Sequence, residues 1–126
     1  MEILILAFKA LSDRNRLRIF AALISYEELC ACQIIELLQV TGATASRHLG
    51  LLITAGLVDS RKKGRWVYYR LHRPHLEPLF EWVKRELVES GEAKDDLKKL
   101  KEITASLPEE ICKRRKEICG VTMSES

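Results

Sequence analysis

Apolar residues recur every three or four positions through the first half of the chain, which is the period of an amphipathic α-helix. The pattern predicts two helices within the first 24 residues, and Ser12 or Asp13 is placed to cap the second of them. A third helix is predicted over about residues 29–38. The chain therefore begins as a helical protein.

A fourth helix is predicted directly after the third. Thr41 is a good N-cap for it, and Gly56 stands where a glycine commonly ends a helix. The positions that this helix would bury are Ala45, Leu49, Leu52 and Ile53. Two helices of this length joined by a tight turn that contains glycine form a helix-turn-helix.

The period changes after residue 57, where β-branched and aromatic residues flank Lys63-Gly64. This pattern predicts a β-hairpin. A helix-turn-helix followed by a basic hairpin is a winged helix. The predicted fold class is therefore mainly α with a small β-hairpin (α+β).

A fifth helix is predicted from Pro74 to about Glu89, and a break follows at Gly91. The remaining residues suggest one helix to about Ser106 and another over about residues 108–119. The apolar face of this last stretch is thin, so we expect it to be mobile unless a partner covers it.

The chain of 126 residues is 47% hydrophobic and 31% charged, which is typical of a soluble globular protein with a modest core. We predict a winged helix-turn-helix domain for DNA binding and dimerisation over residues 1–90. A C-terminal helical tail over residues 91–126 would carry two of the four cysteines.

The formal net charge of +3 is concentrated in one stretch of the chain. Seven basic residues and one acid, Asp59, lie between Thr41 and Arg73, which gives this stretch a charge of +6. The basic residues are Arg47, Arg61, Lys62, Lys63, Arg65, Arg70 and Arg73. A local basic stripe in a nearly neutral protein indicates contact with a polyanion at one face.

In a helix-turn-helix, the second helix enters the major groove of DNA with residues near its N-terminus. Hydroxyl, guanidinium and imidazole groups can reach base edges or phosphates there, and the candidates are Thr44, Ser46, Arg47 and His48. The candidates for phosphate contact at the hairpin tip are Arg61, Lys62, Lys63 and Arg65. The alternative is a winged-helix module for protein contacts, but the clustering of basic residues at the tip favours DNA.

One such module has weak affinity for a groove, so we expect a symmetric homodimer that reads two half-sites of double-stranded operator DNA. The first and fifth helices are more apolar than so small a domain needs, and they are the expected dimer surface. An apolar run of only six residues precedes Lys9, without the flanks of a signal peptide. We therefore expect no membrane contact and a cytoplasmic protein with reduced thiols.

Three stretches of the chain are LAFKALSDRNRLRIFAAL, ELCAC and TASRHLGLLITAGLVDSRKKGRWVYYRL. Together they strongly resemble the ArsR/SmtB metal-responsive winged-helix repressors, over about residues 4–89. ELCAC is similar to the ELCxC metal-sensing sequence of the arsenic- and cadmium-responsive members. The resemblance implies a homodimer that represses a metal-resistance operon and leaves its operator when metal binds Cys30 and Cys32.

The chain departs from the family pattern at two metal sites. Many arsenic sensors have a third cysteine at the position of Ile35. A second site of the family would fall at residues 73–75 and 86–89, where this chain lacks an aspartate and a histidine. The resemblance therefore implies a thiolate site and gives no support for zinc on the fifth helix.

Cys30 and Cys32 would point to nearly opposite sides of an intact helix, which turns about 100° per residue. Two sulfurs on one ion must lie within ~4.6 Å of each other, so metal capture is predicted to distort the helix that supports the DNA-reading helix. Thiolates select As(III), Sb(III), Cd(II), Pb(II) or Zn(II) over hard cations. The competing interpretation is that both cysteines are small buried hydrophobic residues.

The tail cysteines, Cys112 and Cys119, would lie about 10.5 Å apart along an intact helix and could not share one ion without unwinding. Either could supply a third sulfur to Cys30 and Cys32, from the same chain or from the other protomer. Equally, the tail thiols could form a site of their own or none.

The predicted function is repression of a metal(loid)-resistance operon, relieved by As(III) or Sb(III), with Cd(II), Pb(II) or Zn(II) as further candidates. The alternative is a repressor of the same fold that senses oxidants or reactive sulfur species through cysteine pairs. We do not expect an enzyme, because the chain has no CxxC motif, no nucleotide-binding glycine loop and no nucleophile–base pattern around its three histidines.

Overall fold

The structure is a computed structural model that describes residues 1–72, 77–106 and 111. Two expectations lie outside these residues: the start of the fifth helix at Pro74, and the second tail helix with its two cysteines. Within the described part of the chain, no helix combines the length and the apolar character needed to cross a membrane.

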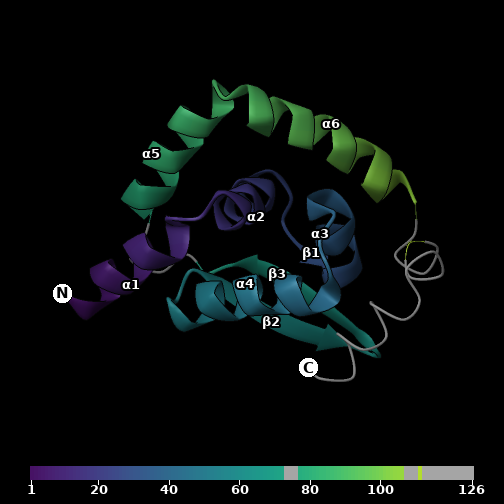
Figure 1. The fold of residues 1–126 in the computed structure, drawn as a ribbon, viewed down its shortest axis with the longest axis horizontal. Coiled ribbons are helices and arrows are strands. Elements are labelled where there is room, and N and C mark those ends of the chain that lie inside the picture. The colour runs from purple at the N-terminus through teal and green to yellow at the C-terminus, as the bar shows by residue number, and fades with distance from the viewer. Residues whose placement is uncertain (73–76, 107–110, 112–126) are drawn as a thin grey trace.

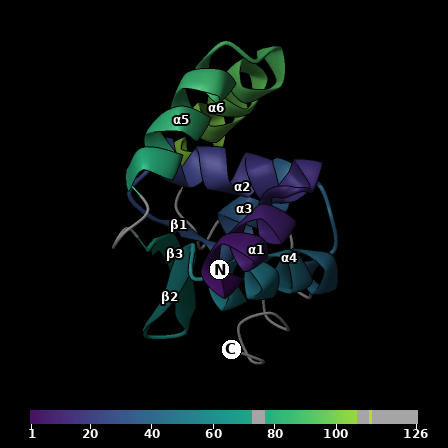
Figure 2. The same ribbon diagram turned by 90° about the vertical axis from the view of Figure 1, so that its left-hand side faces the viewer.

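The described residues form six helices and three short strands. The helices are α1 (Glu2–Leu11), α2 (Arg14–Ser25), α3 (Ala31–Leu38), α4 (Gly42–Thr54), α5 (Glu77–Val88) and α6 (Gly91–Ala105). The strands β1 (Leu29–Cys30), β2 (Val58–Lys63) and β3 (Trp66–Leu71) make one antiparallel sheet in the order β1-β3-β2. Figure 1 shows α5 and α6 as an arch over α2 and α3, on the side away from α4 and the sheet, and Figure 2 shows the same layers from the end near α1.

The helix-turn-helix consists of α3 and α4, as the sequence predicts. Gln39 ends α3 in the left-handed conformation with a φ of 55°. Thr41 caps α4 because its hydroxyl oxygen accepts the N–H of Thr44 at 3.1 Å, and Gly56 follows the helix with a φ of 77°. The predicted burial on α4 is confirmed except at Ile53, which is 39% exposed because it lies at the edge of the buried stripe.

The wing is the hairpin of β2 and β3, which the change of period predicts. Its strands pair from Val58↔Leu71 to Lys63↔Trp66. A two-residue turn joins them and begins with Gly64, whose φ of 61° lies in the region that favours glycine.

The strand β1 is a feature of the fold that the sequence pattern did not predict. Leu29 and Cys30 pair with Tyr69 and Tyr68 of β3, so the hairpin is extended to a three-stranded sheet. The third helix consequently begins at Ala31 rather than near residue 29. A strand of two residues shows no period of its own, and its pairing depends on a strand that comes much later in the chain.

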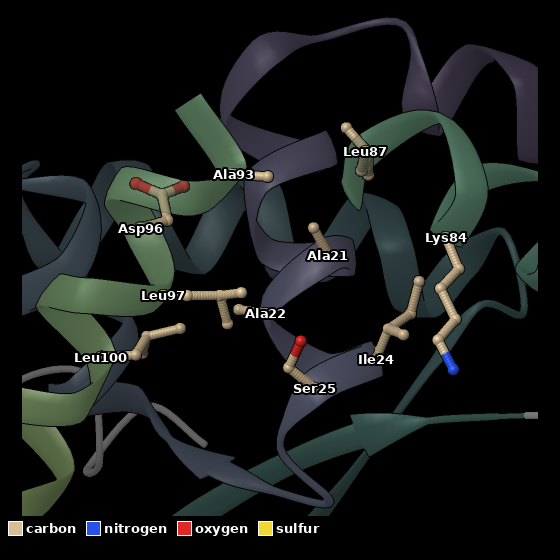
Figure 3. Close-up of a pocket in the computed structure, with 10 residues that line it drawn as sticks. All are labelled: Ala21, Ala22, Ile24, Ser25, Lys84, Leu87, Ala93, Asp96, Leu97 and Leu100. Carbon is tan, nitrogen blue, oxygen red and sulfur yellow. The ribbon is translucent and has the colours of Figure 1, made fainter. Parts of the chain in front are cut away.

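The helix α6 packs against α2 and α3. Leu100 is fully buried, and the guanidinium of Arg18 donates two hydrogen bonds of 2.9 Å to the carboxylate of Asp96. Figure 3 shows Asp96, Leu97 and Leu100 beside Ala22 of α2, around a cavity of about 50 Å³. A space of that size holds no more than a few water molecules. Although its apolar face is thin, α6 is therefore held against the helical core, and the domain division at residue 90 stays a prediction.

Candidate DNA-binding surface and thiol site

The N-terminal half of α4 carries the helix residues that were predicted to contact DNA. Arg47 is exposed, and Thr44 and Ser46 are half-buried. The hydroxyl of Thr41 donates to the hydroxyl oxygen of Thr44 at 2.9 Å, which leaves the Thr44 proton able to donate elsewhere. This part of α4 can therefore present one guanidinium and two hydroxyls to base edges or phosphates.

His48 differs from these residues because its side chain is buried, with 5% of the residue exposed. Its Nδ1 lies 3.2 Å from a guanidinium nitrogen of Arg16 and 4.0 Å from the carboxylate of Asp13. Arg16 also donates to the carbonyl oxygen of Ala10 at 2.6 Å. The His48 ring therefore joins α4 to the turn between α1 and α2, and its contact with DNA stays a prediction.

The burial of His48 predicts a pH dependence of stability. Burial is the main cause that lowers the pKa of His48; the cations of Arg16 and Arg47 add to it, and Asp13 opposes it. The unfolded chain thus binds this proton more readily than the folded chain. The stabilisation is full above the ordinary histidine pKa of about 6.5 and is lost as the pH falls through the lowered folded value.

We expect the urea midpoint of the wild type to fall more between about pH 7 and about pH 5 than that of His48→Gln, because glutamine keeps an acceptor for Arg16 and has no titrating group. His72→Gln is the comparison variant, because it removes a histidine that is 42% exposed and pairs with Asp59 at 2.8 Å. The same pH dependence in wild type and His48→Gln would show that another group is responsible.

All four predicted phosphate contacts of the wing are exposed: Arg61, Lys62, Lys63 and Arg65. Two of them are engaged by one carboxylate. Glu28 accepts a hydrogen bond from the guanidinium of Arg61 at 3.3 Å and one from the ammonium of Lys63 at 2.7 Å. Part of the positive charge at the tip is thus neutralised within the protein.

Two further contacts at the tip involve aromatic rings. The ammonium nitrogen of Lys63 lies 4.9 Å from the ring centroid of Tyr68, and the guanidinium of Arg65 lies 5.4 Å from that of Trp66. Lys62, which alternates to the other face of β2, makes no ion pair with any described residue. These rings support the cations without neutralising their charge.

Both cysteines of the sequence ELCAC are fully buried. Cys30 immediately precedes α3: its N–H donates to the side-chain oxygen of Gln33 at 2.9 Å, and its sulfur accepts the backbone N–H of Gln33. Burial raises the pKa of the Cys30 thiol, and neighbouring backbone N–H groups oppose this shift. Cys30 is therefore a neutral, free thiol, whereas Cys32 in the first turn of α3 is disulfide-bonded.

The structure changes the physical account of these two thiols. The expectation that they lie on opposite sides of an intact helix is wrong, because Cys30 belongs to β1 and precedes the helix. Burial, and not helical geometry, is what keeps a metal ion from the sulfurs. A metal ion can reach Cys30 only if β1 or the first turn of α3 opens, and Cys32 must be reduced as well. Since Cys30 pairs with Tyr68 of β3, such an opening acts on the strand that carries the wing.

The donor set fits a thiophilic ion, because thiolates prefer As(III), Sb(III), Cd(II), Pb(II) or Zn(II) to hard cations. Cys30 and Cys32 supply two sulfurs. Among the residues that the structure describes, no group of three or more His, Cys, Asp or Glu side chains is placed to hold a metal ion. A third ligand would have to come from elsewhere, and the predicted candidates, Cys112 and Cys119, lie outside the described residues.

Gln33 and Glu28 contribute to this region although neither was predicted as a site residue, and Glu28 is the first residue of ELCAC. Gln33 stands three residues after Cys30, which is the spacing of a capping box, and this spacing could have identified it. The pairing of Glu28 with the wing requires β1 to lie beside β3, and no local sequence pattern predicts this strand pairing.

The helix-turn-helix and the thiol segment both fall within residues 11–61, which match the family described as a helix-turn-helix domain. Over 114 residues the chain is 35% identical to the arsenical resistance operon repressor of Escherichia coli K12, a match that covers 90% of this chain and 92% of that protein. The chain belongs to the ArsR/SmtB family of repressors.

Other ArsR/SmtB relatives are more similar over a shorter region. The cadmium resistance transcriptional regulatory protein CadC of Listeria innocua is 50% identical over 74 residues, or 59% of this chain and 62% of that protein. The match therefore spans less than two thirds of that relative. Among solved structures, HlyU from Vibrio cholerae N16961 superposes with a TM-score of 0.63 at 26% identity, over 70% of this chain and 95% of that chain. These matches confirm the winged-helix fold, and the family is one of transcription regulators.

Proposed function

We propose that this chain is a homodimeric, cytoplasmic repressor of a metal(loid)-resistance operon, released from double-stranded operator DNA when As(III) or Sb(III) binds its cysteine thiolates. Cd(II), Pb(II) and Zn(II) are further candidate inducers. The observation that carries the proposal is the position of Cys30, a buried thiol between the start of α3 and the strand that supports the wing. One residue thus adjoins both the helix that packs against α4 and the strand that carries the wing.

In this proposal the N-terminal half of α4 enters the major groove, where Arg47, Thr44 and Ser46 contact base edges or phosphates. The wing contacts the DNA backbone through its four exposed basic residues. These phosphate contacts supply affinity and salt dependence but no sequence information.

Arg47 is the exposed guanidinium in this half of α4, so replacing it with alanine is expected to weaken operator binding. A lost bidentate base contact is worth about 1–3 kcal/mol, or roughly 5- to 150-fold in affinity. The matched control is Lys99→Ala, which removes the same charge from an exposed position on α6. Fluorescence anisotropy with a labelled operator at fixed salt measures the difference. Equal operator affinities of the two variants would show that Arg47 is not part of the proposed interface.

The exposed apolar residues of α1 and α5 support a symmetric dimer. Ile3, Leu4 and Phe8 of α1 are 68%, 53% and 55% exposed, and Trp82 of α5 is 52% exposed. Both helices lie at the same end of the molecule, which Figure 2 shows face on. Contact with a second copy would remove these side chains from water and would present two α4 helices to two half-sites.

The inducer would act by opening the buried thiol site. A thiol reductant must first transfer two electrons and two protons to the disulfide of Cys32. Binding then requires Cys30 and Cys32 to lose their protons, and it brings their sulfurs onto one ion. Because Cys30 pairs with Tyr68 and caps α3 together with Gln33, this movement displaces both the wing and α3. Since α3 packs against α4, the reading helix α4 and the wing then no longer fit the operator at the same time. We assign the third sulfur to Cys112 or Cys119.

A second candidate function is supported by the disulfide at Cys32. Here an oxidant or a reactive sulfur species would be the signal, and two thiols would lose two electrons and two protons to it as the disulfide forms. The reduced protein would bind the operator, and the oxidised protein would leave it.

Gel-shift experiments separate the two functions. Wild-type protein reduced with a phosphine is bound to operator DNA, and arsenite, Cd(II), Mg(II), peroxide or polysulfide is added to separate samples. Metal sensing predicts release by arsenite or Cd(II) and none by Mg(II). Release by peroxide or polysulfide alone would replace metal sensing with redox sensing, and failure of the reduced protein to bind would contradict a repressor. The Cys112→Ser and Cys119→Ser variants test the assignment of the third sulfur.

A further inference from the structure

Glu28 is the carboxylate that lies against the basic tip of the wing. Its side chain is 25% exposed, and its two oxygens pair with Arg61 and Lys63, whose side chains are 49% and 48% exposed. Carboxylates are ionised at neutral pH, so Glu28 presents one negative charge to these two cations.

We propose that Glu28 is an internal competitor of DNA phosphates, whose carboxylate occupies Arg61 and Lys63 and so limits the affinity of the wing for DNA of any sequence. The inference rests on the proposed DNA-binding function. Within the described part of the chain, Lys62 and Arg65 are the basic residues of the tip that no carboxylate engages. Two of the four cations at the tip are thus engaged within the protein, and the single carboxylate cancels one of the four positive charges.

The competing role for Glu28 is to hold the wing in position. The wing, however, is already fixed by six cross-strand pairs between β2 and β3 and by the tight turn at Gly64. Partly exposed ion pairs add little to such a framework. A carboxylate beside a phosphate-contacting cation, by contrast, acts directly on the part of DNA affinity that depends on charge. We therefore expect Glu28 to affect the affinity of the wing for phosphates more than it affects the position of the wing.

The two roles predict different dependences on DNA sequence. Phosphate contacts carry no sequence information, so releasing Arg61 and Lys63 strengthens binding to every duplex. If Glu28 instead holds the wing in position, its replacement would misplace the wing and weaken the complex with the operator.

The test compares wild type, Glu28→Gln and Glu27→Gln for binding to the operator and to a scrambled duplex of equal length, over a range of salt concentrations. Glutamine keeps the size of glutamate and one acceptor oxygen without the charge. Glu27→Gln changes the net charge equally at the neighbouring, exposed position, which makes no ion pair with the described part of the wing. Glu28→Asp, which keeps the charge, separates charge from shape.

We expect Glu28→Gln to bind both duplexes about 3- to 10-fold more tightly near physiological salt. The slope of log affinity against log salt concentration should become more negative by about one to two. Glu27→Gln and Glu28→Asp should stay within about twofold of wild type. The proposal is overturned if Glu28→Gln binds like wild type or more weakly, if it gains affinity for the operator alone, or if Glu27→Gln gains as much. If wild type does not prefer the operator to the scrambled duplex, the proposed function fails instead, and the scrambled duplex still tests Glu28.

Discussion

Replacing Cys30 with serine is expected to abolish the release of operator DNA by arsenite or cadmium while leaving metal-free binding unchanged. A serine hydroxyl is a hard ligand and a poor partner for these soft ions. Serine is also a preferred N-cap residue, and the Gln33 N–H that the Cys30 sulfur accepts is available to its oxygen. The start of α3 should therefore survive the substitution, and only the response to metal should be lost.

The measurement is the inducer concentration that releases half of a labelled operator from reduced protein. We expect this concentration to rise by at least about 100-fold in Cys30→Ser, because the loss of even an outer-shell partner commonly costs 10- to 100-fold in metal affinity. The metal-free operator affinity of the same variant is the internal control for folding. If the inducer concentration for half-release is unchanged in Cys30→Ser, Cys30 is not a ligand of the inducer.

Replacing Leu100 with alanine is expected to lower the free energy of unfolding by about 2–5 kcal/mol, which is the range for large-to-small substitutions in cores. Leu100 is fully buried where α6 meets α2, and the lost side chain would enlarge the cavity of about 50 Å³ in Figure 3. The loss is expected to be large because the Arg18–Asp96 ion pair holds α6 in place beside the gap.

The control for this prediction is Leu97→Ala on the same helix. Leu97 is 38% exposed, so we expect a loss of about 1 kcal/mol or less. Urea unfolding of both variants at the same protomer concentration measures the difference, since dimer formation would add to the apparent stability. Equal losses would mean that α6 is not docked as the structure shows.

The parts of the fold that depend on local chemistry could be predicted from the sequence. The cap at Thr41, the glycines at positions 56 and 64 and the alternating wing residues act over a few positions each, and all are as expected. The same signals placed Arg47 on the exposed side of the second helix of the motif.

The remaining features depend on contacts between distant segments. Cys30 is a strand residue because β3 pairs with it, and His48 is buried because Arg16 lies against it. In the same way, the ion pair between Arg18 and Asp96 joins segments that no helical period connects. A periodic pattern shows which face of a helix is apolar but not which distant element will cover it.

The central claim is that capture of a metal ion by Cys30 and Cys32 is itself the event that releases DNA. One titration tests it directly: Cd(II) is added to reduced protein bound to a labelled operator, and thiolate-to-metal charge-transfer absorption is followed together with fluorescence anisotropy. The account predicts that both signals end at the same number of metal equivalents and that both are lost in Cys30→Ser. Complete development of the absorption with the operator still bound, or release of the operator without it, would contradict the account.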